Sequence, residues 1–287
     1  MSLLTFQQLD EAIHKYDLVL FDLWGVIIEG DSTYPGVVEA VNNMITRTNV
    51  MFLTNAPRPN FKVAENLRKW GITNAKEDMV VTSGDLARQM IQAHNSNFEG
   101  KTPKIYHLGE DRNEDILINF NHELTQDLDN ADILLLSLYR DDHEDIHEFN
   151  NILKQAALKK DLLILCSNPD TTIPKHGTIR YCAGHFAEII EKFGGEVVYT
   201  GKPKEVIYNF ALQKQPHIKK ERILMIGDTF ETDILGANKA GIHSALVLSG
   251  NSAPFHNMHE SMDDKLSALH KHAQKTGIIP SFVTSIV

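Results

Sequence analysis

Two aspartates lie at predicted strand ends, where α/β sheets usually place their functional residues. Asp22 lies in the apolar run LVLFDL (18–23), and Asp228 follows the run RILMIG (222–227). Open α/β sheets bind their ligands beyond the carboxyl ends of their strands. A carboxylate in that position can attack phosphorus as a nucleophile and can hold a divalent cation. By itself, Asp22 could equally cap a helix or occupy a turn, so its interpretation depends on the other strand ends.

Two more strand ends carry groups that suit a phosphate ligand. The run VMFLT (50–54) ends in Thr54, and Asn55 follows it, so a hydroxyl and an amide are available as donors to phosphate oxygens. Lys202 precedes a predicted helix, where its charge and the helix N-terminus both favour an anion. Asp233 comes one or two turns after Asp228. Together these residues supply the parts of a Mg²⁺ site and a phosphate cradle.

The elements that must position these residues alternate along the chain. Short apolar runs rich in β-branched residues predict buried strands, and the segments between them have helical spacing. Gly71 follows the helical segment 61–70, and Gly241 follows the segment 231–240, as expected for left-handed residues at helix ends. Ser83 is the predicted cap of a further helix. This alternation predicts an α/β protein with mainly parallel strand pairing.

The middle of the chain, from about residue 81 to 194, differs in character. It contains the polar connection HNSNFEGKTPK and the acidic run DDHEDIHE, and it has strand candidates of its own at 104–108, 133–138 and 162–166. We therefore predict a second domain that is inserted into the first. The last residues, TGIIPSFVTSIV, are either a tail or a terminal strand.

Four motifs, FDLWGVI, FLTN, GKP and GDTFETD, occur in this order at the predicted strand ends. In this combination the sequence resembles the haloacid dehalogenase-like (HAD) phosphatase superfamily. Three short features are similar to those of its class IIA, NagD-type subgroup: Pro35–Gly36, Thr82–Ser83 and Asn168–Pro169–Asp170. The resemblance covers nearly the whole chain. It implies a Rossmann-like, parallel-sheet HAD core at residues 1–80 and 195–287, and a large inserted α/β cap at 81–194 that closes over the core and selects the substrate.

The resemblance also implies the central roles at the site. Asp22 would attack the phosphoryl group and form an aspartyl-phosphate. Mg²⁺ would be held by Asp22, Asp228 and the backbone carbonyl of Trp24. Lys202 would bind the transferring phosphate and offset the crowded carboxylates, while Asp233 would orient Lys202 or a metal-bound water. These roles amount to electrostatic positioning, as in phosphoryl transfer generally.

Five further residues are expected to bind phosphate or substrate: Thr54, Asn55, Arg58, Asn168 and Asp170. Thr54 would bind the transferring phosphate, and Asn55 would position the phosphate or the leaving group. Arg58 follows the second motif closely enough to reach an anionic substrate, although a surface role stays open. Asn168 and Asp170 belong to the subgroup motif in the cap.

Trp24 departs from the family pattern at a position that matters for catalysis. The first motif of the family has a second aspartate two residues after the nucleophile, which protonates the leaving oxygen and later activates water. General acid–base help of this kind is worth about 10²–10⁴-fold in rate. An indole has no proton to exchange near neutral pH, so Trp24 cannot take over this role, although its backbone carbonyl can still bind Mg²⁺.

Three interpretations follow from Trp24. The protein is a slow phosphatase that works best on leaving groups needing little protonation, or a cap residue replaces the missing acid or base, or the site binds a phosphorylated ligand and releases it unchanged, as a sensor does. The candidate cap residues are Asp170, His185 and the pair His143–His147. The acidic neighbours of that pair favour a solvated helix face over a metal site. Because every other motif is retained, we predict a phosphohydrolase acting on a small sugar- or nucleotide-type phosphomonoester.

Composition and charge restrict the class of protein. The chain has 287 residues and a formal net charge of -10 with neutral histidines, which argues against a broad basic surface for nucleic acid. It has neither a signal-peptide pattern nor about eighteen continuous apolar residues, so no membrane partner is predicted. Cys166 and Cys182 favour a reduced, cytoplasmic location over a secreted disulfide framework. The predicted partner is a small phosphorylated metabolite, and the family resemblance adds a possible homodimer through the cap.

Overall fold

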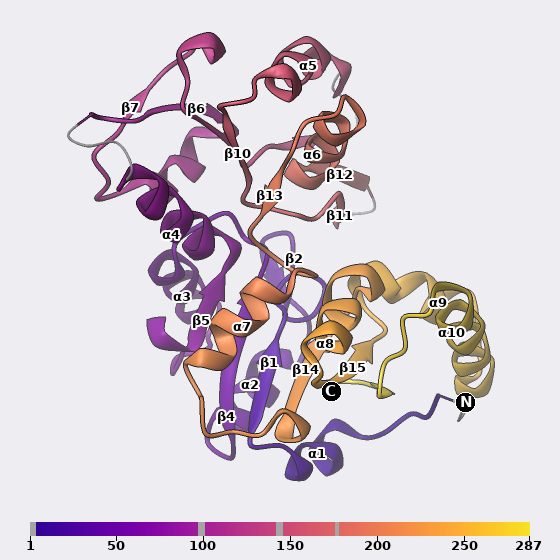
Figure 1. Cartoon of the computed structure of the whole chain (residues 1–287). Helices are drawn as coiled ribbons and strands as arrows, with labels where there is room; N and C mark the ends of the chain where they lie inside the picture. Colours follow the sequence, from indigo (N-terminus) through magenta and orange to yellow (C-terminus); the bar gives the residue numbers. More distant parts are fainter. Residues whose placement is uncertain (1–3, 97–100, 142–145, 176–177) are drawn as a thin grey trace. The chain divides into compact units, whose positions relative to one another are not determined.

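The computed structural model describes residues 4–96, 101–141, 146–175 and 178–287 (Figure 1). The chain forms two compact units. The first, called the core unit, comprises Met1–Thr54, Phe61–Val81 and Lys202–Val287. The second, called the cap unit, comprises Asn55–Asn60 and Thr82–Gly201. The predicted boundaries at 80/81 and 194/195 had assigned two short segments, 55–60 and 195–201, to the core, whereas both belong to the cap unit.

Six strands form the sheet of the core unit: β1 (Leu18–Phe21), β4 (Asn49–Thr54), β5 (Val80–Thr82), β14 (Ile223–Gly227), β15 (His243–Val247) and β16 (Phe282–Thr284). Their order is β16-β15-β14-β1-β4-β5. The pairings of β1 with β4 and β14, and of β15 with β14 and β16, are all parallel. Every residue of β1 is buried, as expected for a strand covered on both faces. The predicted α/β class with mainly parallel pairing is therefore confirmed, and the C-terminal segment contributes a strand.

Helix α1 (Leu9–Ala12) precedes β1, and the other helices lie between the strands: α2 (Val37–Ile45), α3 (Asn60–Lys69), α7 (Glu205–Gln213), α8 (Leu235–Ala240), α9 (Ala253–Asn257) and α10 (Met262–Thr276). A small hairpin, β2 (Ile28–Glu29) and β3 (Ser32–Thr33), follows β1. Figure 1 shows α7 and α8 over the face of the core sheet that is turned to the viewer. Gly71 and Gly241, the predicted helix stops, have φ angles of 100° and 71°, which favour glycine.

The cap unit has a parallel sheet of its own with the order β13-β10-β8-β6-β7. Its strands are β6 (Lys104–Leu108), β7 (Glu123–Leu124), β8 (Ile133–Leu136), β10 (Leu163–Cys166) and β13 (Val198–Tyr199). A second, antiparallel sheet contains β9 (Tyr139–Asp141), β11 (Thr172–Lys175) and β12 (Thr178–Cys182). The helices are α4 (Ser83–Asn95), α5 (Asn150–Leu158) and α6 (Ala183–Lys192). Each strand predicted in this part of the chain is present, and apolar residues of β8, β10 and α6 share one buried cluster.

Thr82, rather than Ser83, caps helix α4. The Thr82 hydroxyl accepts a hydrogen bond from the Asp85 N–H at 2.8 Å and donates to the carbonyl oxygen of Arg58 at 2.6 Å. Ser83 is the first helical residue, and its buried hydroxyl lies 2.8 Å from that of Thr200. The prediction that Ser83 caps this helix was wrong because both residue types are good caps, and only the extended backbone of Thr82 decides between them.

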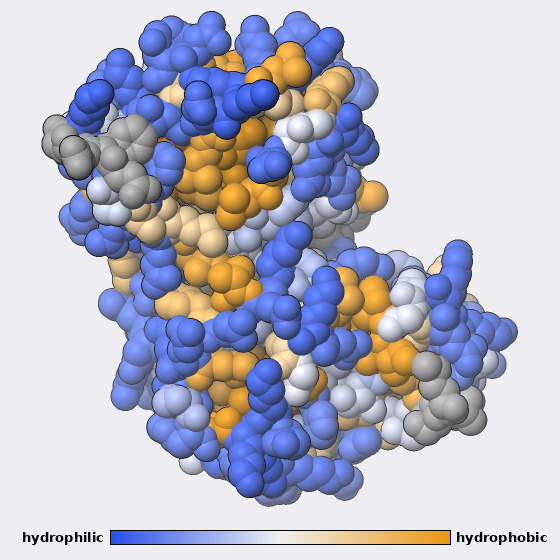
Figure 2. Space-filling model, in the orientation of Figure 1, coloured by the Kyte–Doolittle hydropathy of each residue, from blue (hydrophilic) through white to orange (hydrophobic). Residues whose placement is uncertain are grey.

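Hydrophilic residues cover most of the face seen in Figure 2, with hydrophobic residues exposed between them. Among the described residues, no helix combines the length and the apolar character needed to cross a membrane. Both cysteines are buried, and neither is in a disulfide. Cys166 packs in the apolar cluster of the cap unit, as expected for a small buried hydrophobe.

Candidate functional site

The register of the core sheet brings the predicted strand ends to one edge. Phe21, the last residue of β1, is paired with β14 on one side and with β4 on the other. Because all three strands are parallel, Asp22, Thr54 and Asp228 all stand at the carboxyl edge of the sheet. This is the edge at which open α/β sheets bind their ligands.

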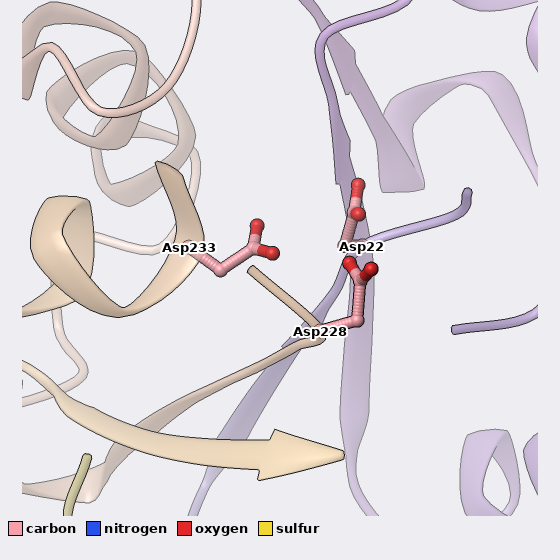
Figure 3. Close-up of side chains that lie close together, drawn as sticks. All are labelled: Asp22, Asp228 and Asp233. Atoms are coloured by element: carbon pink, nitrogen blue, oxygen red, sulfur yellow. The ribbon is translucent and has the colours of Figure 1, made fainter. Parts of the chain in front are cut away.

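Asp22, Asp228 and Asp233 form one buried cluster at this edge. A carboxylate oxygen from each residue lies within 4.8 Å of the others. Figure 3 shows the three side chains converging from β1, from the end of β14 and from the turn before α8. Their exposed fractions are 7%, 1% and 0%. When carboxylates lie close together and are shielded from water, their ionised forms are unfavourable unless a positive charge lies beside them.

Lys202 supplies positive charge to this cluster. Its ammonium nitrogen lies 2.6 Å from Oδ1 of Asp22 and 2.7 Å from Oδ1 of Asp233, and the side chain is 2% exposed. A buried ammonium needs such carboxylate partners. Lys202 offsets one of the three carboxylate charges, and the remainder fits a divalent cation. The hard oxygen ligands and their burial are suited to Mg²⁺.

Asp228 has the most unfavourable environment for an ionised carboxylate. Burial, followed by repulsion from Asp233 and Asp22, raises the pKa of Asp228 well above its ordinary value. Two donors nevertheless face its carboxylate. The Asn251 N–H donates to Oδ2 at 2.6 Å, and the Thr229 hydroxyl donates to Oδ1 at 3.2 Å. A bound cation would favour the ionised form further, so these contacts fit a metal ligand.

Asp233 is positioned by an unusual helical turn. Phe230–Ile234 form a π-helical turn before α8, and such turns are frequent at functional sites. The buried phenol of Tyr208 donates to the carbonyl oxygen of Asp233 at 3.0 Å. Burial raises the pKa of Tyr208, and the neighbouring Asp233 adds to this, so the phenol stays protonated and can donate. Tyr208 thus holds the backbone that presents Asp233 to Lys202.

Trp24 follows Asp22 in a tight turn after β1. The Ile28 N–H donates to the carbonyl oxygen of Leu23 at 3.0 Å, and Trp24 forms an isolated bridge with Ile28. The next residue, Gly25, has a φ angle of 83°, and a Cβ at this position would collide with the carboxylate of Asp228. The turn therefore needs glycine both for its backbone angle and for its close approach to Asp228.

Asn55, Asn168 and Asp170 meet in the cap unit. The Asn55 side-chain amide donates to Oδ1 of Asp170 at 2.8 Å. In the orientation that satisfies its neighbours, the Asn168 amide donates to the Asn55 carbonyl oxygen and to Oδ2 of Asp170, both at 3.3 Å. Gly201 lies against this group, because a Cβ there would collide with Asn55 and Pro169. Packing thus requires the glycine of the GKP motif.

Arg58 is paired with a carboxylate that the sequence had not pointed out. Its Nε and Nη2 donate to Oδ2 of Asp115 at 3.0 and 2.5 Å. The carbonyl oxygens of Ala56 and Arg58 accept hydrogen bonds from the Gly84 N–H and the Thr82 hydroxyl. The segment 55–60 is therefore fastened to the cap unit by backbone and side-chain contacts.

The residues considered as replacements for the missing acid or base lie in the cap unit. The ring of His185 packs against Tyr181 and Phe186, with centroid distances of 4.7 and 5.4 Å. Burial lowers the pKa of His185, which favours its neutral form. His147 lies in a short 3₁₀ segment, and His143 lies outside the described residues. Asp170 is engaged with Asn55, as described above.

Residues beyond the family motifs also contact the carboxylate cluster. The loop after β15, residues 249–252, contacts Asp228 and Gly25, and Tyr34 lies next to this loop. A signal for the loop was present in the sequence, because the apolar run SALVL (244–248) resembles the other strands and ends in the polar residues SGNS. No such pattern in the sequence pointed to Asp115, Tyr208 or Tyr34.

Comparisons with known proteins agree with this architecture. A family model described as haloacid dehalogenase-like hydrolase matches residues 16–241. The chain is 28% identical over 240 residues to ribonucleotide monophosphatase NagD of Escherichia coli K12, covering 82% of the chain and 88% of that protein. It is 25% identical over 280 residues to phosphoglycolate phosphatase 2 of Arabidopsis thaliana, with coverages of 87% and 88%. The solved structure of a possible sugar phosphatase of the HAD superfamily from Cytophaga hutchinsonii is similar over 99% of both chains, with a TM-score of 0.80 and 25% identity.

Proposed function

We propose that this chain, which belongs to the haloacid dehalogenase-like hydrolases, is a Mg²⁺-dependent phosphatase that hydrolyses a small phosphomonoester through an aspartyl-phosphate at Asp22. Similarity to NagD agrees with class IIA, and relatives named as phosphatases support action on phosphoric esters. One observation carries the proposal: three buried carboxylates and a buried lysine meet at the carboxyl edge of the parallel sheet. Such a group of charges is unfavourable to bury unless a cation and an anionic ligand use it.

Asp22 is the nucleophile in this proposal. One of its carboxylate oxygens bonds to phosphorus while the bond between phosphorus and the leaving oxygen breaks, and the leaving group departs as an alkoxide or aryloxide that takes its proton from water. Water then attacks phosphorus, the bond to Asp22 breaks, and inorganic phosphate leaves. Lys202 contacts Oδ1 of Asp22 at 2.6 Å, so it can orient the nucleophile and stabilise the charge that develops on the phosphoryl oxygens.

The remaining residues of the core unit hold the cation and the phosphoryl group. Asp22, Asp228 and the backbone carbonyl of Trp24 are the proposed ligands of Mg²⁺, which when bound would neutralise the phosphoryl oxygens. The Thr54 hydroxyl is a proposed donor to the phosphate. Asp233 keeps Lys202 in place, because its Oδ1 accepts from the lysine at 2.7 Å.

The residues at 55–60 and in the cap motif are proposed to act on the rest of the substrate. Asn55 would position the phosphate or the leaving group, and Asn168 and Asp170 would orient its amide, as their hydrogen bonds indicate. Arg58 remains a proposed anion contact, with Asp115 fixing its guanidinium. The names of the relatives favour a sugar- or nucleotide-type phosphate as substrate.

Trp24 restricts which esters react well. Without a carboxylate at this position, neither protonation of the leaving oxygen nor activation of water has the usual partner. We therefore expect slow turnover, and best rates with leaving groups that depart without protonation. The same residue is the specific observation behind a second candidate, a protein that binds a phosphorylated ligand without hydrolysing it. The relatives give this second candidate no support.

A panel of phosphomonoesters tests the proposal directly. Hydrolysis is measured with Mg²⁺ and with EDTA for the wild type, for Asp22→Asn and for Asp17→Asn. Asp17 is a matched control because it lies before the same strand β1, exposed and paired with Arg222 at 2.7 Å. The proposal predicts Mg²⁺-dependent turnover that only Asp22→Asn abolishes. Absence of turnover across the panel, with Mg²⁺-dependent phosphate binding retained, would favour the binding protein instead.

A further inference from the structure

A loop outside the four motifs contacts one proposed metal ligand, Asp228, and Gly25, the neighbour of a second, Trp24. This clamp loop, residues 249–252, follows strand β15. The Ser249 hydroxyl donates to the carbonyl oxygen of Gly25 at 2.5 Å. The Asn251 N–H donates to Oδ2 of Asp228 at 2.6 Å, and the Ser252 hydroxyl donates to the Asp228 carbonyl oxygen at 2.5 Å. The loop therefore bonds to both the backbone and the side chain of Asp228, and to the turn that carries Trp24.

Gly250 brings the clamp loop against Asp228 and Gly25. Its φ angle is 50°, and a Cβ at this position would collide with the Asp228 carboxylate and with Cα of Gly25. A Cβ at Gly25 would likewise collide with the Asp228 carboxylate. The clamp loop, the turn at Gly25 and the end of β14 thus approach so closely that a side chain larger than hydrogen at Gly250 would displace Asp228.

Tyr34 fastens the clamp loop to the hairpin that follows the first motif. Its hydroxyl donates to Oε2 of Glu29 at 3.0 Å, and the Gly250 backbone hydrogen-bonds to the phenol. Burial and the Glu29 carboxylate raise the pKa of Tyr34, so the phenol stays protonated and keeps donating to Glu29. Hairpin, loop and Asp228 are therefore joined in one hydrogen-bonded arrangement.

This arrangement matters because the side chain of Trp24 has no carboxylate. Trp24 can offer a cation only its backbone carbonyl, so the position of that ligand depends on whatever holds the turn. The Ser249 hydroxyl holds the carbonyl oxygen of the next residue, Gly25, and the Asn251 N–H holds the carboxylate of Asp228. Groups that orient metal ligands in this way typically change metal affinity by about 10–100-fold when removed.

We propose that the clamp loop, fastened by Tyr34, sets the metal affinity of this protein by holding Asp228 and the Trp24–Gly25 turn at a fixed separation. Ser249, Gly250, Asn251 and Tyr34 are positioning residues in this inference. It rests on the proposed function, because it concerns the same cation site.

Metal binding to the substrate-free protein tests the inference. Dissociation constants for Mg²⁺ and Mn²⁺ are measured by titration calorimetry for the wild type, Gly250→Ala, Ser249→Ala and Tyr34→Phe. We expect weakening of about 10-fold or more for Gly250→Ala and a smaller, several-fold weakening for the other two. Tyr16→Phe is the matched control, because it loses a hydrogen bond to His243 at 3.0 Å next to the opposite ends of the strands, and its affinity should equal that of the wild type.

Urea unfolding in EDTA separates positioning from general destabilisation. For Ser249→Ala and Tyr34→Phe, the stabilisation that Mg²⁺ adds should shrink more than the metal-free stability. If both variants, and a folded Gly250→Ala, bind metal like the wild type while Asp228→Asn does not, the cation site stands and the clamp inference is overturned. If the wild type itself binds neither metal, the proposed Mg²⁺ site fails and the inference fails with it.

Discussion

The polar cluster of the core unit and that of the cap unit are both largely buried, yet their charges are arranged differently. In the core unit, the carboxylates of Asp22, Asp228 and Asp233 lie together, and Lys202 offsets only part of their charge. In the cap unit, Asp115 accepts two hydrogen bonds from the Arg58 guanidinium, and Asp170 accepts from the amide of Asn55. The first cluster has surplus negative charge on adjacent carboxylates, whereas in the second each carboxylate faces a donor of its own, a guanidinium for Asp115 and an amide for Asp170.

This difference separates a site from a scaffold. Burying like charges side by side is unfavourable, so such a cluster is maintained where a ligand supplies the opposite charge. Separate carboxylates that each accept from a side-chain donor hold a segment in one position, as the cap unit holds residues 55–60. We therefore expect substitutions in the core cluster to change chemistry and metal response, and those in the cap cluster to change mainly substrate affinity and stability.

The largest difference is expected between Lys202→Met and Arg58→Met. Loss of Lys202 removes the cation that contacts both Asp22 and Asp233, so kcat should fall by about 10³-fold or more. It also leaves buried carboxylates without their partner, which should lower the metal-free unfolding free energy by about 3–5 kcal/mol. Arg58→Met should lower kcat by no more than about 10-fold. Steady-state kinetics and urea unfolding measure both, and equal losses of kcat would remove the proposed distinction between the clusters.

Trp24→Asp should act on the chemistry alone. The new carboxylate restores a group that can protonate the leaving oxygen, so hydrolysis of poor leaving groups should rise by about 10²-fold or more. Activated aryl phosphates need little protonation and should gain much less. A series of aryl and alkyl phosphates measures this as a flatter dependence of rate on leaving-group pKa. A folded variant with an unchanged dependence would show that the missing acid does not limit turnover.

Asp170→Ala should alter substrate affinity more than turnover. The substitution removes the acceptor that fixes the Asn55 amide, and hydrogen bonds to charged groups are worth about 1.5–3 kcal/mol. We expect a rise in KM of about 10-fold, with a smaller change in kcat. Metal affinity should stay that of the wild type, because Asp170 belongs to the cap cluster. A loss of Mg²⁺ binding as large as that of Asp228→Asn would contradict this separation.

Asp228→Asn and Asp115→Asn should change stability in opposite directions when metal is absent. Burial and the neighbouring carboxylates raise the pKa of Asp228 in the folded protein. Its stabilising contribution is therefore complete below its ordinary pKa of 3.8 and is lost as the pH rises through the higher folded value. Asparagine cannot ionise, so at pH 7 in EDTA the Asp228→Asn variant should have a higher melting temperature than the wild type. In a protein of this size, a change of about 1 kcal/mol in the unfolding free energy shifts the melting temperature by roughly 2–4 °C.

Asp115→Asn instead weakens the pair with Arg58 and should melt below the wild type at the same pH. Only the wild type and Asp115→Asn should gain stability from added Mg²⁺. Calorimetric melting curves between pH 4 and 8, with EDTA or Mg²⁺, measure these effects. A lower melting temperature for Asp228→Asn in EDTA would mean that the core cluster is not strained by its own charge.

The sequence predicted those features of the fold and of the site that depend on local residue patterns. The apolar runs located the strands, and their alternation with helices predicted mainly parallel pairing, so Asp22 and Asp228 could be expected at the same edge of the sheet. The helix stop at Gly241 was also readable, because a residue that needs a positive φ favours glycine.

Contacts between distant residues could not be predicted in the same way. Asp115 is separated by 57 positions from Arg58, and no local pattern marks it as the partner. The partner of Tyr208, the carbonyl oxygen of Asp233, lies 25 positions further along the chain, and no local pattern connects the two. Thr82 and Ser83 were equally good caps by residue type, and only the extended backbone of Thr82 decides between them. Such partners depend on how the elements pack.

The most direct test of the proposed chemistry is to trap the phosphorylated enzyme. An activated phosphomonoester and Mg²⁺ are mixed with the wild type, acid stops the reaction within the first turnover, and peptides are analysed by mass spectrometry. Because Trp24 cannot activate water, the phosphoryl group should accumulate on the peptide that contains Asp22. It should be absent in Asp22→Asn and reduced in Trp24→Asp. Turnover by the wild type without a phosphorylated Asp22, or turnover retained in Asp22→Asn, would contradict the aspartyl-phosphate mechanism.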